Sequence, residues 1–113
     1  MGDITYAQEK LRATVTSLAD SEGSLRDRLL NAYLSQGERT PVVDGGQWYP
    51  DLADRIKSLH ERLTSTPAVA DEGTIAASVA ALPDEEVRDV VREILDLESC
   101  VNDLYWHERG ARL

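Results

Sequence analysis

The sequence predicts an all-α fold, a small bundle of four to five helices with a long C-terminal helix and one long loop at about residues 35–49. Three observations lead to this prediction. Apolar residues recur at steps of three and four along most of the chain, which is the helical period. Gly and Pro gather between these stripes and break them. Leu, Val, Ala and Ile dominate the apolar set, Phe is absent, and Ala and Leu favour helix. A length of 113 residues predicts one domain, residues 1–113.

Two helices are expected before the loop. The first covers residues 3–20, with Asp3 as its N-cap. Ser24 is expected to cap a second, shorter helix over residues 24–34. The first helix carries a single apolar stripe, formed by Ile4, Ala7, Leu11, Val15 and Leu18. The second buries Leu25, Leu29, Leu30 and Tyr33.

Three more helices are expected after the loop. The first begins with Pro50 in its first turn and presents Leu52, Ile56, Leu59 and Leu63. A short helix over residues 74–82 follows. The last runs from about residue 84 to 109, with acids in its first turn and Gly110 behind its C-terminus.

The last helix carries an apolar seam at heptad spacing. Its members are Val87, Val90, Ile94, Leu97, Val101 and Leu104. This spacing fits a parallel coil between two copies or the spine of a bundle. In the coil Glu93 would face Glu98 of the other copy, and these charges repel. We therefore predict a spine, with a homodimer as the alternative.

The charge balance favours a basic partner. The formal net charge is −9, and residues 84–108 hold nine acids and two bases. Such a surface repels phosphates, so we expect no direct binding of nucleic acid. It attracts a protein with a basic surface.

Four of these acids share one face of the last helix, in line with Cys100: Asp89, Glu93, Asp96 and Asp103. Few bases on that helix are available to pair with them. The stripe is either a solvated face or a docking stripe for a basic protein. We expect no metal and no cofactor, because carboxylates in line do not converge on one ion.

The loop ends in a tryptophan and a tyrosine. Trp48 and Tyr49 stand between the pair Gly45–Gly46 and Pro50, in a chain with six large aromatic residues. We expect the Trp48 ring to fold inward against the helix that follows. The alternative is an interface anchor, which exposure of both Trp48 and Trp106 would support.

One short string bears on catalysis. Arg55 and His60 form R-x4-H, which resembles the catalytic signature of the helical HEPN ribonucleases over six residues. The resemblance implies RNA cleavage in which the arginine and the histidine act together on the scissile phosphate, often across a dimer. Ile56 stands where that family commonly has a polar residue. On a regular helix the two side chains point about 140° apart.

The remaining polar side chains predict structural roles. His107 is expected to interact with the terminal carbonyls of the last helix. Acidic neighbours are expected to raise the pKa of the Cys100 thiol and to make it a poor nucleophile. The single cysteine, the lack of a signal-peptide pattern and the lack of an apolar run of about 20 residues predict a cytoplasmic protein that does not enter membranes.

Together these features predict a non-catalytic protein that binds another protein through the acidic face and the aromatic loop. Inhibitors, antitoxin-like or immunity-like proteins and phage-type blockers fit this description. The alternatives are a HEPN-like ribonuclease that uses Arg55 and His60, and a self-associating scaffold.

Overall fold

The computed structural model describes residues 3–69 and 73–111. These residues form five α-helices and a short 3-10 turn, with no strand among them. The helices are α1 (Ile4–Asp20), α2 (Leu25–Ser35), α3 (Leu52–Arg62), α4 (Gly73–Ala81) and α5 (Asp84–Ala111), and the 3-10 turn spans Gly37–Arg39. The predicted all-α bundle is confirmed.

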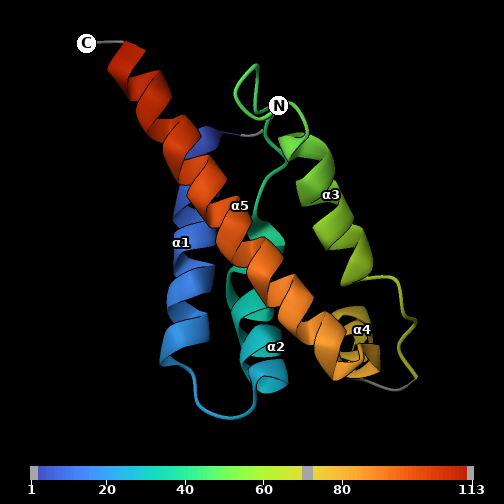
Figure 1. The fold of residues 1–113 in the computed structure, drawn as a ribbon. Helices are drawn as coiled ribbons and strands as arrows, with labels where there is room; N and C mark the ends of the chain where they lie inside the picture. The colour runs from blue at the N-terminus through green and yellow to red at the C-terminus, as the bar shows by residue number, and fades with distance from the viewer. Residues whose placement is uncertain (1–2, 70–72, 112–113) are drawn as a thin grey trace.

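The long helix α5 is the spine of the molecule. Its 28 residues correspond to about 42 Å of helix, and the longest dimension of the molecule is 50 Å. Helices α1, α2 and α3 pack against α5, and α4 packs against α2. In Figure 1, α5 crosses the whole bundle, with α1 and α3 on opposite sides of it.

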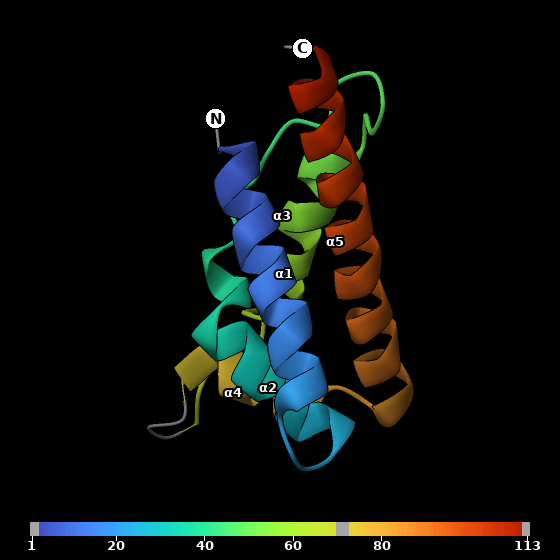
Figure 2. The same ribbon diagram turned by 90° about the vertical axis from the view of Figure 1, so that its left-hand side faces the viewer.

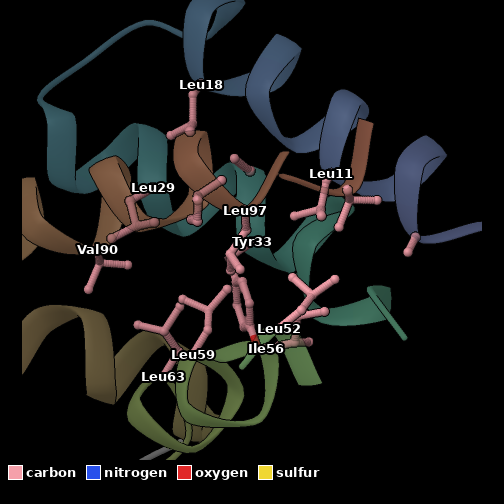
Figure 3. Close-up of a cluster of buried hydrophobic side chains, with 14 of the residues drawn as sticks. Leu11, Leu18, Leu29, Tyr33, Leu52, Ile56, Leu59, Leu63, Val90 and Leu97 are labelled. Carbon is pink, nitrogen blue, oxygen red and sulfur yellow. The ribbon is translucent and has the colours of Figure 1, made fainter. Parts of the chain in front are cut away.

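The apolar seam of α5 is buried within one chain. All six of its residues are less than 5% exposed. They belong to one cluster of buried side chains that draws on all five helices, and Figure 3 shows side chains of that cluster converging. The prediction of a spine covered by shorter helices is confirmed.

Two of the predicted helix starts are confirmed and two boundaries need correction. The Asp3 carboxylate accepts a hydrogen bond from the Thr5 N–H at 2.9 Å, and the Ser24 hydroxyl accepts one from the Asp27 N–H at 3.1 Å. Pro50 does not lie in the first turn of α3, because Asp51 is the N-cap and the helix begins at Leu52. Gly110 does not end α5, which continues to Ala111.

The long loop is anchored along its length. Thr40 and Val43 are buried, and Val43 belongs to the core. The His60 ring connects this loop to two helices: its Nε2–H donates to the Thr40 carbonyl at 2.9 Å, and its Nδ1 accepts from the Tyr33 hydroxyl. Burial is the main cause that raises the pKa of Tyr33. The loop is therefore a fixed part of the bundle.

One end of the bundle collects three separate segments. The start of α1, the end of the loop and the C-terminal part of α5 lie together at the top of Figure 2. Helix α4 and the connection between α1 and α2 lie at the opposite end. Trp48 and Tyr49 of the loop and Trp106 of α5 belong to the segments at the end that holds the start of α1.

Candidate functional site

A tight turn forms the end of the loop, and two glycines make it possible. The Tyr49 N–H donates to the Gly45 carbonyl at 3.1 Å, and the Gly46 N–H donates to the Asp44 carboxylate at 2.8 Å. A Cβ on Gly45 would lie 1.9 Å from the Tyr49 carbonyl oxygen. Gly46 has a φ of +59°, which side chains disfavour. The turn presents Trp48 on its outer side.

Trp48 is exposed and does not enter the core. Its side chain remains 55% exposed, so the expectation that the ring folds inward is wrong. One face of the indole stacks on His107, with ring centroids 4.5 Å apart and planes within 4°. We predicted that His107 interacts with the terminal carbonyls of the last helix, whereas in the structure its ring stacks on Trp48. Its Nε2 lies 3.5 Å from the Asp103 carboxylate.

Tyr49 fastens the turn to α5 at a second point. Its hydroxyl donates to Asp103 Oδ2 at 2.5 Å. That hydrogen bond is the main cause that raises the pKa of Tyr49 to about 12. With the Trp48–His107 stack, it gives the turn two attachments to one helix, so Trp48 is held in a defined position.

Trp106 is the second exposed tryptophan at this end. It is 59% exposed, and the neighbouring Tyr105 ring meets it edge-on at 5.3 Å. The Arg109 guanidinium lies over the Tyr105 ring, 4.8 Å from the ring centroid. Both tryptophans of the chain are thus more than half exposed near the C-terminal part of α5. We call Trp48, Tyr49 and Trp106 the aromatic surface.

An open cleft adjoins Trp48. Its volume is about 830 Å³, and it lies between the start of α1, the turn and α5. The described lining comprises Asp3, Ile4, Asp44, Gly45, Gly46, Gln47, Trp48, Leu104, His107 and Glu108. Three carboxylates face this volume, and no lysine or arginine lines it in the described part of the chain. Sequence reasoning missed Asp3, Asp44 and Glu108 as a group, because three distant segments supply them.

The predicted acidic stripe has intrachain partners. The Arg55 guanidinium of α3 pairs with Glu93 at 2.7 Å and with Asp96 at 2.6 Å. The hydrogen bond to Glu93 is the main cause that raises the pKa of Arg55. Asp103 accepts from Tyr49, and Asp89 lies 3.9 Å from Arg92. We expected few bases on α5 itself to pair with the stripe, and the central base is Arg55 of the neighbouring helix α3.

Cys100 lies beside the same arginine. Its Sγ is 3.7 Å from Arg55 Nη1. The pKa of the Cys100 thiol is raised, as expected, but burial is the main cause, and Asp96 and Asp51 add to it while Arg55 opposes it. No group of three or more His, Cys, Asp or Glu side chains within residues 3–69 and 73–111 is arranged to hold a metal ion.

The structure does not bring Arg55 and His60 together. Arg55 reaches α5, whereas His60 bonds to Tyr33 of α2 and to Thr40 of the loop. Their side chains serve different elements of the bundle. The geometry adds nothing to the six-residue resemblance to HEPN ribonucleases.

The Arg55 pairs predict a measurable contribution to stability. We expect Arg55→Met to lower the free energy of unfolding by about 1 kcal/mol, because Glu93 and Asp96 then repel without a shared cation. The matched control is Arg62→Met on the same helix, where the distance to Glu86 is 3.8 Å and the arginine side chain is more exposed than that of Arg55. Urea unfolding of the two variants measures the difference, and equal losses would contradict this assignment.

Comparison of the chain with models of protein families, with curated proteins and with solved structures gave no match. Within the described ranges, no helix is both long enough and apolar enough to cross a membrane.

Proposed function

We propose that the protein acts without catalysis of its own, by binding another protein through the aromatic surface and the acids around it. The observation that carries the proposal is the exposure of both tryptophans at one end of the bundle, 55% for Trp48 and 59% for Trp106. Tryptophan and tyrosine are the residues that most often contribute binding energy at protein interfaces. The double attachment of the turn to α5 keeps Trp48 in place before binding, which lowers the entropy cost of association.

The charge distribution favours a partner with a basic surface. The chain carries a formal net charge of −9. Asp44 and Glu108 line the cleft beside Trp48, and Asp103 lies 3.5 Å from the His107 ring that stacks on Trp48. The acidic stripe adds less negative charge than the sequence suggested, because Arg55 pairs with Glu93 and Asp96 at its centre. Asp89 and the more exposed side of the Asp96 carboxylate contribute most of its charge to a partner. Inhibitors and immunity-like proteins that cover a basic active site fit these properties.

Affinity capture from the cells that naturally carry the protein tests this proposal. The bait is the immobilised chain, washed at about 0.05 M and at about 0.5 M salt, since exposed charges are screened at the higher concentration. We expect a protein with a basic surface to be retained at low salt and weakened at high salt. The Trp48→Ala/Trp106→Ala double variant is expected to lose it.

A matched control separates the aromatic surface from general hydrophobicity. Leu34→Ala/Leu95→Ala removes two other exposed apolar side chains, which are 41% and 44% exposed. This variant is expected to retain the partner. Equal retention by both double variants, or a captured set without a basic protein, would refute the proposal.

Two other functions stay as separate predictions with their own tests. A HEPN-like ribonuclease predicts RNA cleavage by the wild-type chain that His60→Ala abolishes. A self-associating scaffold predicts a molar mass above that of one chain. Neither has an observation in its favour comparable to the exposed tryptophans.

A further inference from the structure

We infer that the cleft beside Trp48 receives an arginine side chain of the partner protein. This inference rests on the proposed function and names the chemistry of its central contact. Trp48 and three carboxylates line a volume of about 830 Å³ that opens to solvent. An arginine is the side chain that uses both kinds of group, because its planar guanidinium stacks on an aromatic ring and its N–H groups donate to carboxylates.

The indole of Trp48 offers the stacking surface. His107 covers one face of the ring at 4.5 Å with nearly parallel planes. Since the side chain is still more than half exposed, the other face and the ring edge remain open to a partner. The hydrogen bond and the turn that fix Tyr49 also fix the neighbouring indole.

The carboxylates around the cleft keep acceptor oxygens for a donor from outside. One oxygen of Asp3 caps α1 and one oxygen of Asp44 closes the turn, at 2.9 and 2.8 Å. Glu108 has no hydrogen bond or ion pair within the described ranges. The stripe acids Glu93 and Asp96 differ in this respect, because Arg55 already occupies them. No lysine or arginine lines the cleft within the described ranges, although Arg109 lies with Asp3 and Glu108 around a smaller adjoining pocket.

Charge also decides between a foreign partner and a second copy of this chain. Each copy carries a formal charge of −9, and the cleft region is acidic on both, so two copies repel at this surface. A basic protein is attracted and is steered toward it. The occupant we assign is therefore an arginine on the basic surface of another protein.

An NMR titration of the ¹⁵N-labelled full chain tests this assignment. The probe is N-acetyl-arginine amide, with N-acetyl-citrulline amide as its neutral isostere and N-acetyl-lysine amide as the non-planar cation. We expect the indole N–H resonance of Trp48 to shift and saturate with the arginine probe, to shift less with lysine and not to respond to citrulline. The Trp106 resonance is the internal control, since Trp106 does not line the cleft.

Matched charge variants complete the experiment. Glu108→Gln is expected to weaken binding of the arginine probe about two- to fivefold, the effect of losing one exposed ion pair. Glu85→Gln, an exposed acid at the other end of α5, is expected to leave binding unchanged. An equal response to citrulline, equal shifts at both tryptophans, or no shift at all would overturn the inference.

This titration needs no partner protein, so its failure is distinct from failure of the proposed function. If the partner is captured only when both tryptophans are present, but the arginine probe causes no shift of the Trp48 resonance, then only the arginine site is refuted. Arginine binding at Trp48 without any captured partner refutes the proposed function instead.

Discussion

Leu97→Ala is expected to lower the free energy of unfolding by about 2–5 kcal/mol, the largest effect of any substitution considered for this chain. Leu97 lies in the middle of the α5 seam and is fully buried. Figure 3 shows its side chain among those of Leu11, Leu29 and Tyr33. Shortening the isobutyl side chain to a methyl group leaves a cavity that helices packed on several sides cannot close.

The control for this substitution lies two residues away. Leu95→Ala changes the same residue type on the same helix, but Leu95 is 44% exposed. We expect a loss within about 0.5 kcal/mol, as is usual for surface positions. Urea unfolding of both variants measures the contrast. A small effect of Leu97→Ala would show that α5 is not the covered spine of the bundle.

Gly45→Ala is expected to lower the free energy of unfolding by about 2 kcal/mol and to release Trp48 from its position. The turn must open and lose the two hydrogen bonds that Tyr49 donates, to the Gly45 carbonyl and to Asp103. The new Cβ would lie 1.9 Å from the Tyr49 carbonyl oxygen and 2.7 Å from the carbonyl carbon. Both atoms belong to the backbone and cannot rotate away. We expect the Trp48 indole resonance to move toward the position of a mobile tryptophan, and arginine binding to weaken with it.

Gly46→Ala provides the comparison. A Cβ there meets nothing within 4 Å, although the φ of +59° disfavours alanine. The expected cost is about 1 kcal/mol, the usual penalty for a side chain in the left-handed region. The Trp48 resonance should stay near its wild-type position. If both variants released Trp48 equally, close packing at Gly45 would not be what holds the turn.

The sequence predicted most of the fold because helical periodicity and caps are local signals. The stripe of α1, the caps Asp3 and Ser24, and the seam of α5 all follow from residues within a few positions of each other. The two boundary errors, at Pro50 and Gly110, also concern local signals. Proline and glycine are common near helix ends but do not fix the terminal residue.

The site was only partly predictable because its contacts join distant segments. Trp48, Trp106 and the stripe acids were identified as candidates, but the sequence did not show that Arg55 lies between Glu93 and Asp96. It also did not show that His107 stacks on Trp48 across some sixty residues of chain. The Gly45–Gly46 pair did indicate a backbone conformation that other residues disfavour. At Gly45 the reason is the Tyr49 carbonyl oxygen, which would lie 1.9 Å from a Cβ.

Whether the aromatic surface serves a foreign basic partner or a second copy of the chain separates the proposed function from a self-associating scaffold. The direct measurement is the molar mass of the isolated chain by light scattering over a wide range of concentration, repeated with Trp48→Ala/Trp106→Ala. We predict 12.5 kDa, the mass of one chain, for both proteins at every concentration. A wild-type chain of twice that mass that the double substitution returns to a monomer would contradict the account.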